Sequence, residues 1–398
     1  MKITYNIFIY IYILILKFIS LFNKKAYYLL EGQKNLLEKV KESISNSEKI
    51  VWFHASSLGE YEQVKPIIIS YLKKNLDHKI LLTFYSPSGY RNFNSEKFID
   101  WVFYLPHDRL TDVRNFINIV NPIKVIFVKN EFWYNYIMEL SKKKIPIYFV
   151  CSIFRKDQYF FKFYGFWFRK QLRKVTCFFL QDMNSRNLLE KIDIKNISVV
   201  GDSRFDIAIK NTKEEFSNDK ISEFCKNSKI FIAASINKKD MRIIKDIPKK
   251  MGYKIIIVPH ETVNSKKYIL AENYITLSNY TNYDKDYDYL IIDEIGILKK
   301  LYRYANLVYL GGGFSKGIHN ITEAIAYKKH VIFGPKYKKF PEAIDIIKLN
   351  YGDSISNSND LKNSIIKFEN SNLHHTIEEY LNKKTGVANK IATRISTK

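Results

Sequence analysis

Short apolar segments alternate along most of this chain with longer segments in which apolar residues recur every third or fourth position. The short segments predict buried β-strands and the longer ones predict amphipathic helices. Strands are predicted, in chain order, at residues 50–53, 80–83, 101–104, 125–128, 147–150, 177–180 and 197–200, and then at 230–233, 254–258, 289–292, 307–310 and 331–333. Because strands alternate with helices in both halves, the sequence predicts an α/β protein with two parallel sheets, each covered by helices.

A polar and charged segment, residues 205–227, separates the two groups of strands, and we interpret it as a link between domains. The predicted division is an N-terminal apolar segment (1–25), two Rossmann-like domains (26–205 and 206–375) and a C-terminal helix (376–398). Ligands of such sheets bind at the carboxyl ends of the strands, so the predicted site is a central cleft that both domains face.

The N-terminal segment is nearly all apolar over residues 7–22, interrupted by Lys17 and followed by Lys24 and Lys25. It is short for a membrane-spanning helix, which needs about 20 apolar residues. No small-residue cleavage site follows it, which argues against a cleaved signal peptide. The flanking tyrosines and lysines favour a membrane anchor with the rest of the chain on the cytoplasmic side; an uncleaved targeting segment and a buried helix are the alternatives.

The formal net charge of +24 is high for a chain of 398 residues. It indicates either an anionic partner, such as acidic lipid or a phosphorylated substrate, or a compositional bias, since Lys, Ile, Asn and Tyr are abundant throughout. The lysines are not grouped in a basic arm, so no nucleic-acid partner is predicted. The three cysteines, Cys151, Cys177 and Cys225, form no C-x-x-C pair, which predicts neither a zinc site nor a disulfide framework and fits a reducing cytoplasm.

The first candidate site follows the first predicted strand, in the stretch HASSLGEYEQV (residues 54–64). Glu60 is either a helix-stabilising residue, since carboxylates interact favourably with a helix N-terminus, or a catalytic residue. Gly59 permits a tight turn and His54 adds a polar group at the same strand end, which favours the catalytic interpretation. The helix dipole is expected to lower the pKa of Glu60.

Two further blocks carry charged residues just after strands. Glu131 in VKNEFWYN (128–135) follows another strand of the same sheet and could share a pocket with Glu60. Arg204 in VVGDSRFD (199–206) could hold a phosphate bidentately, or it could form an ion pair with Asp202 or Asp206.

The second half contains the glycine-rich stretch LVYLGGGFSKGIHNITEA (307–324). Its three consecutive glycines would let backbone N–H groups approach an anion. Asn320 and Glu323 have the spacing of a capping box. The functional alternative is that this helix N-terminus attracts a phosphate while Glu323 accepts ribose hydroxyls.

Two shorter loops, at residues 259–260 and 295–297, end strands of the same half and fit either a binding site or ordinary turns. Asp284 and Asp286 have a spacing that could hold a divalent metal. They lie in a loop rich in Tyr and Asn, so a solvated loop is the favoured interpretation and no metal site is predicted.

Together these blocks resemble those of the 3-deoxy-D-manno-octulosonic acid (Kdo) transferases, membrane-associated enzymes that attach Kdo to lipid A precursor. FHASSLGE is similar to the family's His-Ala-x-Ser-x-Gly-Glu block, and NEFWYN to Thr-Glu-Leu-Trp-Pro-Asn. GDSRFD is similar to Gly-Asn-x-Lys/Arg-Phe-Asp, and GGGFSKGIHNITEA to Gly-Gly-Ser/Gly-Phe followed by Gly-x-His-Asn-x-x-Glu. The resemblance extends from about residue 22 to about residue 353, with the four blocks in the family's order.

The resemblance implies a GT-B glycosyltransferase that moves Kdo, with inversion, from CMP-Kdo to lipid A precursor (lipid IVA) in lipopolysaccharide biosynthesis. It implies action at the cytoplasmic face of the bacterial inner membrane, with no cofactor. It implies Glu60 as the general base, and Glu131 and Arg204 as stabilisers of the transition state. The CMP-Kdo contacts that it implies are Pro259, His260, Ile295, Gly296, Ile297, Gly312, Gly313, His319, Asn320, Ile321, Thr322 and Glu323.

Four positions depart from the family's pattern. No Arg stands between Pro259 and His260, Ile236 replaces a Ser or Thr, Tyr134 replaces a Pro, and Ile297 replaces an acidic residue. None of these changes removes a proposed catalytic group. Two other functions stay open: a GT-B transferase or epimerase that uses a UDP-sugar, and an inactive, membrane-anchored basic binding protein.

Overall fold

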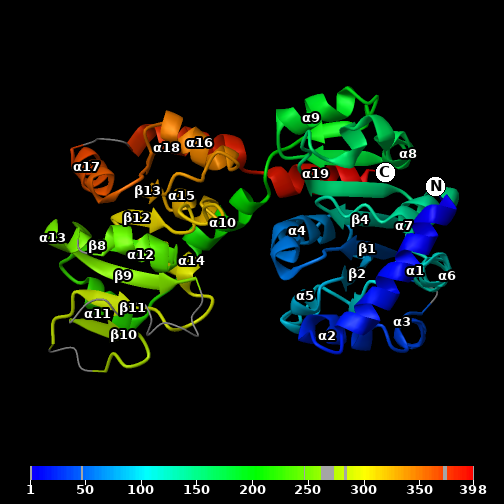
Figure 1. The fold of residues 1–398 in the computed structure, drawn as a ribbon, viewed down its shortest axis with the longest axis horizontal. Helices are drawn as coiled ribbons and strands as arrows, with labels where there is room; N and C mark the ends of the chain where they lie inside the picture. The colour runs from blue at the N-terminus through cyan, green and yellow to red at the C-terminus, as the bar shows by residue number, and fades with distance from the viewer. Residues whose placement is uncertain are drawn as a thin grey trace. The chain divides into compact units, whose positions relative to one another are not determined.

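The computed structural model describes residues 2–45, 48–245, 247–260, 273–281, 285–370 and 374–397. Its contacts divide the chain into two compact units (Figure 1): unit 1 is Met1–Ser203 with Gly386–Lys398, and unit 2 is Arg204–Thr385. Each unit contains a seven-stranded sheet, and all the strand pairs in both sheets are parallel. The predicted fold class of two parallel α/β sheets is therefore confirmed.

The sheet of unit 1 has the order β3-β2-β1-β4-β5-β6-β7. Its strands are β1 (Ile50–His54), β2 (Lys79–Phe84), β3 (Trp101–Tyr104), β4 (Lys124–Val128), β5 (Ile147–Ser152), β6 (Cys177–Leu180) and β7 (Ile197–Val199). The strand order reverses between β1 and β4, which pair directly, with His54 opposite Phe127. Such a reversal point is where doubly wound sheets bind ligands, outside the carboxyl ends of the strands.

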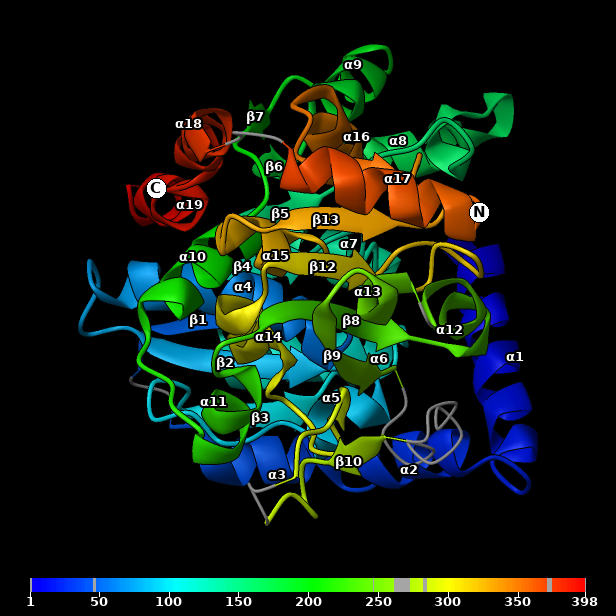
Figure 2. The same cartoon turned by 90° about the vertical axis from the view of Figure 1, so that its left-hand side faces the viewer.

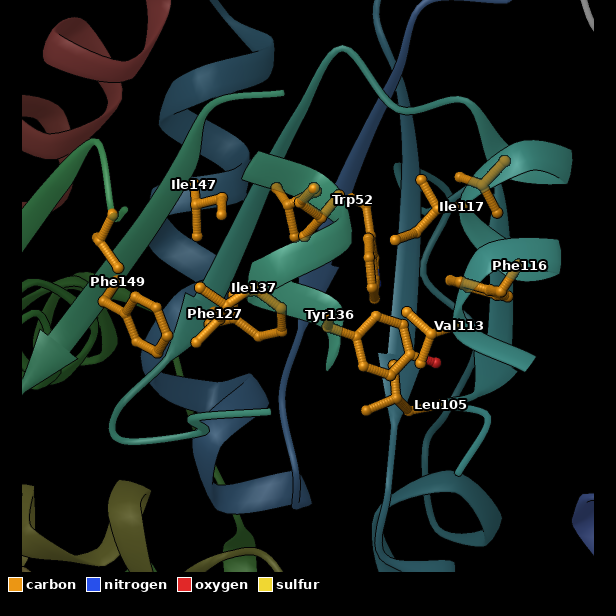
Figure 3. Packing of buried hydrophobic residues seen from close by; sticks show 14 of the residues in the cluster. Trp52, Leu105, Val113, Phe116, Ile117, Phe127, Tyr136, Ile137, Ile147 and Phe149 are labelled. Carbon is orange, nitrogen blue, oxygen red and sulfur yellow. The ribbon is translucent and has the colours of Figure 1, made fainter. Parts of the chain in front are cut away.

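Helices cover both faces of this sheet, which is why its strands are apolar on both sides. They are α1 (Lys2–Ile19), α2 (Lys24–Gly32), α3 (Leu36–Ser43), α4 (Leu58–Leu72), α5 (Pro87–Arg91), α6 (Leu110–Val120), α7 (Tyr134–Lys142), α8 (Phe166–Leu172), α9 (Met183–Glu190) and α19 (Val387–Ser396). Trp52 is the centre of one face (Figure 3): its ring lies 5.1 Å from that of Phe116 and 5.5 Å from that of Tyr136. Its indole N–H donates to Thr83 Oγ1 at 2.8 Å, so the polar atom of this buried ring is satisfied.

The C-terminal helix α19 belongs to unit 1 because its apolar side covers the other face of the sheet, next to α4. Val387, Ile391 and Ile395 are buried there. The ammonium group of Lys124 donates to the Ile395 carbonyl at 2.6 Å, which fixes the end of the helix to β4.

Unit 2 repeats the architecture with the order β10-β11-β9-β8-β12-β13-β14. Its strands are β8 (Lys229–Ile236), β9 (Tyr253–Pro259), β10 (Tyr274–Thr276), β11 (Tyr289–Ile291), β12 (Leu307–Leu310), β13 (His330–Phe333) and β14 (Gly352–Ser354). Its helices are α10 (Arg204–Lys213), α11 (Asp219–Cys225), α12 (Lys238–Ile244), α13 (Ile247–Lys250), α14 (Leu298–Leu301), α15 (Thr322–Ala326), α16 (Pro341–Lys348), α17 (Ser358–Glu369) and α18 (His374–Lys384). The order reverses between β8 and β12.

The interpretation of residues 205–227 as an inter-domain link is wrong. The segment forms α10 and α11, and both helices belong to unit 2. Phe205, Ile221 and Phe224 are buried in its core. Apolar residues alternate with charged and polar ones in both helices, and this mixed pattern hid the helices in the sequence.

Candidate active site at the strand ends

The carboxyl ends of β1 and β4 bring Glu60 and Glu131 to one edge of the unit 1 sheet. After β1 the chain turns into α4, which places Glu60 in the first helical turn. After β4, Lys129 adopts a left-handed conformation (φ 58°) and Glu131 follows shortly. Glu60 Oε2 accepts a hydrogen bond from Ser56 N at 2.6 Å, which holds the carboxylate over the turn.

The electrostatics of Glu60 are those of a partly desolvated carboxylate beside a second one. Burial, and then the negative charge of Glu131, raise the pKa of Glu60 above its ordinary value. Lys129, the Ser56 N–H and His54 act in the opposite direction without cancelling this effect. The expectation that the helix N-terminus lowers this pKa is therefore wrong, because desolvation and a like charge outweigh the helix. Such a group is typical of sites that exchange protons.

His54 lies at the end of β1 with a fully buried side chain. Its Nδ1 lies 2.9 Å from Thr83 Oγ1 and 3.1 Å from the Thr83 carbonyl oxygen, so Nδ1 carries the hydrogen in the latter contact. Its Nε2 lies 3.8 Å from Glu131 Oε2 and has no hydrogen-bond partner among the described residues. The buried imidazole thus lies directly behind the Glu131 carboxylate.

Gly59 is not required by a tight turn, contrary to expectation. It lies inside α4 without a positive φ, and a Cβ at this position would meet no atom within 4 Å. Glycine in a helix is usually unfavourable. Here it leaves open space beside Glu60, where a bulky substrate can approach the backbone closely.

The reversal point of unit 2 is organised by a buried carboxylate, Asp240, which the sequence analysis missed. Asp240 is 0% exposed and accepts hydrogen bonds from the Tyr309 hydroxyl (2.9 Å), Gly312 N (3.0 Å) and Asn237 N (3.0 Å). The sequence analysis expected the N–H groups of the three glycines to approach an anion. The N–H of Gly312 instead donates to Asp240 within the protein. A visible signal was the spacing of Asn237 and Asp240, which form a capping box.

The glycines of this loop are explained by close backbone packing. A Cβ on Gly311 would lie 2.4 Å from the Ser235 carbonyl oxygen, and one on Gly313 would lie 2.6 Å from Gly334 Cα. Gly312 has a φ of +91°, a conformation that favours glycine. The loop is thus a rigid connection across the end of the sheet.

Two of the residues predicted to contact CMP-Kdo, His260 and His319, lie together at the carboxyl ends of the unit 2 strands. Their rings stack with centroids 4.3 Å apart and an interplanar angle of 28°. His260 follows Pro259, the last residue of β9, and its N–H donates to the Ile236 carbonyl at 3.0 Å. Burial, and then the neighbouring His260, lower the pKa of His319.

The predicted capping box at residues 320–323 is wrong. Helix α15 begins at Thr322, with Ile321 at its N-cap position. Asn320 Oδ1 instead accepts from Thr322 N at 3.3 Å and from Thr322 Oγ1 at 2.7 Å. Asn320 is exposed, Glu323 is half-buried in the first turn, and Ile321 and Thr322 are buried. The 295–297 loop follows β11, which β9 separates from β8; Ile295 is 84% exposed and Gly296 has a φ of +92°.

Arg204 is the first residue of α10 and belongs to unit 2. Its guanidinium forms an ion pair with Glu342 on α16 at 2.6 Å, a partner that the sequence analysis did not name. The Glu342 side chain is only 10% exposed, so the pair is largely shielded from water. Glu342 lies far along the chain in a segment without other site residues, and no local signal pointed to it.

The described residues contain no group of three or more His, Cys, Asp or Glu side chains arranged to hold a metal ion. The metal spacing considered in the sequence included Asp284, which lies outside the described residues.

Comparisons with known proteins match this chain to the same family that its motif blocks resemble. Residues 33–207 match the model of the 3-deoxy-D-manno-octulosonic-acid transferase (kdotransferase) family. The 3-deoxy-D-manno-octulosonic acid transferase of Aquifex aeolicus is 26% identical over 348 residues, which cover 81% of this chain and 86% of that protein. That of Rickettsia prowazekii is 24% identical over 85% of this chain and 76% of that protein.

Residues 33–207 of this chain carry the domain of the Kdo transferase family. The chain is therefore a glycosyltransferase, and the family predicted from the motifs is confirmed. A bifunctional glycosyltransferase/methyltransferase from Fusobacterium nucleatum is also similar, with 27% identity over 81% of this chain, but the match spans only 53% of that longer protein.

Solved structures with the same fold support the two-domain architecture of this family member. A putative UDP-N-acetylglucosamine 2-epimerase from Listeria monocytogenes superposes with a TM-score of 0.60 at 12% identity, over 88% of this chain and 95% of that one. The UDP-GlcNAc 2-epimerase from Methanocaldococcus jannaschii superposes with a TM-score of 0.57 at 17% identity, over 88% of this chain and 99% of that one. At these identities the likeness concerns the fold alone.

Proposed function

We propose that this enzyme transfers Kdo from CMP-Kdo to lipid A precursor (lipid IVA), with inversion at the anomeric carbon, in lipopolysaccharide biosynthesis. The observation that carries the proposal is the Glu60–Glu131 pair at the reversal point of unit 1, with the unpartnered Nε2 of buried His54 beside it. Family membership supports the sugar. The acceptor and the mechanism are our inference.

Glu60 is the proposed general base. As the acceptor hydroxyl oxygen attacks the anomeric carbon of Kdo, its proton passes to Glu60. At the same time the bond from that carbon to the CMP phosphate breaks, and the bonding electrons leave with CMP. Among the described residues only one oxygen of Glu60 is hydrogen-bonded, to Ser56 N, so Oε1 is free to accept the proton. A raised pKa makes this carboxylate a stronger base than an ordinary glutamate.

Glu131 is proposed to stabilise the positive charge that develops on the sugar ring, because in this single transition state bond breaking is further advanced than bond formation. Its side chain is only 21% exposed, so its field acts through a partly desolvated site. His54, which Thr83 holds through Nδ1, would keep the Glu131 carboxylate in place from below the site. The open space at Gly59 would admit the acceptor sugar next to the base.

Unit 2 is proposed to bind the donor. The stacked pair of His260 and His319 offers a flat surface for the CMP moiety, and the 295–297 loop and residues 320–323 would contact it from the neighbouring strand ends. Arg204 would hold the phosphate that leaves, with Glu342 keeping its guanidinium oriented. Because CMP carries a single phosphate, we propose that no metal or other cofactor takes part.

We place the enzyme at the cytoplasmic face of the inner membrane, where its lipid acceptor would lie. Helix α1 is the one helix of the described chain that is long and apolar enough to cross a membrane, by length and composition.

The test is a product analysis with two donors. The detergent-extracted protein is incubated with lipid IVA and either CMP-Kdo or UDP-GlcNAc, and products are identified by mass spectrometry and nuclear magnetic resonance. We expect lipid IVA to gain Kdo only with CMP-Kdo, together with release of CMP that depends on acceptor. Epimerisation or transfer from UDP-GlcNAc would favour a UDP-sugar enzyme. Absence of any turnover in a folded sample would favour a binding protein.

A further inference from the structure

Exposed apolar side chains are concentrated at the N-terminus. Half of the large apolar side chains that are exposed in the described chain lie between Ile3 and Phe22. They include Ile3 (76% exposed), Phe8 (62%), Leu14 (63%) and Phe18 (67%). We call this set the outer face of α1. A contiguous apolar surface of this kind marks contact with a membrane or a partner.

The opposite side of α1 is fixed to unit 1 along most of its length. The Tyr5 hydroxyl donates to Asp108 Oδ2 at 2.5 Å, and Asn135 Nδ2 donates to Asn6 Oδ1 at 2.9 Å. Asp108 is buried and also accepts from the backbone N–H groups that begin α7, so this contact reaches the interior. Ile9 and Ile13 are buried on the same side.

This attachment conflicts with a spanning orientation. A helix that crosses a bilayer exposes its whole circumference to lipid, and polar contacts such as Tyr5–Asp108 would have to break. With one side on the protein and the other apolar, α1 has the form of a helix that lies in the membrane surface.

A second apolar element adjoins the start of α1. Residues 159–167, which we call the aromatic segment, expose Phe163 (91%), Tyr164 (52%) and Phe166 (53%). Its last residue, Trp167, lies 6.0 Å from the ring of Tyr5. Both views place the N-terminal end of α1 beside α8, which the aromatic segment enters (Figure 1, Figure 2).

Within the two stretches of sequence that form these elements, every charged residue is a cation. No Asp or Glu occurs before Glu31, whereas Lys17, Lys24 and Lys25 accompany α1. Likewise no acidic residue occurs between Asp157 and Asp182, a stretch that carries Lys162, Arg169, Lys170, Arg173 and Lys174. Apolar side chains bordered by cations match a bilayer with anionic headgroups.

We propose that the outer face of α1 and the aromatic segment form one membrane-binding surface, on which α1 lies parallel to an anionic phospholipid bilayer without crossing it. Both the N-terminus and the catalytic unit are then on the same side of the membrane. This inference deepens the proposed function and rests on it for the identity of the acceptor, but the membrane contact itself requires neither donor nor acceptor.

The attached side of α1 also connects this surface with the candidate site. The Tyr85 hydroxyl donates to the Tyr12 hydroxyl at 3.3 Å, and the rings of Tyr85 and Trp133 lie 4.7 Å apart. Trp133 in turn contacts the ring of His54, with centroids 6.4 Å apart. The proposed membrane surface and the candidate site are therefore joined by directly packed side chains within unit 1.

Topology is tested by cysteine labelling of the full chain in sealed proteoliposomes. Lys2→Cys reports the N-terminus and Lys74→Cys, on an exposed part of unit 1, reports the catalytic unit, both in a Cys225→Ser background because Cys151 and Cys177 are buried. A membrane-impermeant maleimide is expected to label both positions from the same side. Labelling of Lys2→Cys only from the opposite side would overturn the proposal.

The aromatic segment is tested by flotation with vesicles of phosphatidylglycerol and phosphatidylcholine. We expect the double variant Phe163→Asp/Phe166→Asp to bind at least tenfold more weakly than the parent chain. Leu76→Asp, at a side chain that is 90% exposed after α4, is the matched control and should bind normally. Equal binding by the double variant and the control would overturn the role of the segment. Because neither experiment uses CMP-Kdo, these failures are distinct from a failure of the transferase proposal.

Discussion

The reversal points of the two sheets share a topology but use their carboxylates in opposite ways. In unit 1, Glu60 and Glu131 lie near each other, and the negative charge of Glu131 contributes to the raised pKa of Glu60. Among the described residues, Glu60 accepts a single hydrogen bond, from Ser56 N. In unit 2, Asp240 is buried with three donors around it and connects the glycine loop to α12. One fold can therefore hold a carboxylate with few donors and a raised pKa at one reversal point, and a carboxylate with three donors at the other.

The largest expected effect is on activity at unit 1. Glu131→Gln should lower kcat about 100-fold, because it removes a charge that stabilises the transition state in a partly desolvated site. The measurement is acceptor-dependent CMP release. The control is Glu62→Gln, because Glu62 is an exposed glutamate two positions after Glu60 in α4. This variant should leave kcat unchanged. If Glu131→Gln stayed within threefold of the parent enzyme, Glu131 would not act on the reacting ring.

Stability should respond to charge removal with opposite signs in the two units. Asp240→Asn should lower the free energy of unfolding by about 2–3 kcal/mol, since an amide cannot accept all three bonds that the carboxylate accepts. Glu131→Gln should leave stability unchanged or raise it, because it removes repulsion from Glu60. Urea unfolding followed by circular dichroism measures both. A loss of stability in Glu131→Gln equal to that in Asp240→Asn would contradict the comparison.

Glycine-to-alanine substitutions should change the free energy of unfolding with opposite signs in the Gly312 loop and at Gly59 in α4. Gly312→Ala should destabilise the protein by about 1–3 kcal/mol, because its φ is +91° and the new Cβ would lie 2.4 Å from the Gly317 carbonyl oxygen. Gly59→Ala should stabilise it by about 0.4–1 kcal/mol, since the position is helical and open. Gly59→Ala should nevertheless raise KM for the acceptor. Unchanged acceptor kinetics would show that the open space is not used.

The smallest expected effect is a shift of the pH profile. Glu60 must be ionised to act as a base, so kcat/KM should fall as pH drops through its raised pKa. Glu131→Gln removes a cause that raises this pKa and should move the acid limb to lower pH. Lys129→Met removes a cause that lowers it and should move the limb to higher pH. Shifts of the same sign in both variants would refute this assignment of the limb to Glu60.

Much of the fold was predictable because parallel strands buried on both faces give continuous apolar segments such as those around Trp52 and Tyr309. Strands β10 and β14 were missed, since each has only three residues and β14 (Gly352–Ser354) carries no large apolar side chain. Helices α10 and α11 were missed because charged and polar residues interrupt their apolar pattern.

The candidate site was predictable only in part. Motifs identified Glu60 and Glu131, but the direction of the Glu60 pKa depends on burial and on a neighbour brought close by the sheet. Asp240 accepts a hydrogen bond from Tyr309, and Glu342 forms an ion pair with Arg204. Both partners are distant in the chain, so the spacing of residues in the sequence does not reveal them. The burial of one side of α1 also required the structure, because its sequence is apolar on almost every side.

The most direct test of the central claim is the rate of acceptor-dependent CMP release in a single turnover by Glu60→Gln, beside the parent enzyme and Glu62→Gln. We predict a loss of at least 100-fold in Glu60→Gln, with parent-like rates in Glu62→Gln and no loss of stability in either variant. Release by Glu60→Gln at the parent rate would contradict the account, since a base at the carboxyl end of β1 would then be unnecessary.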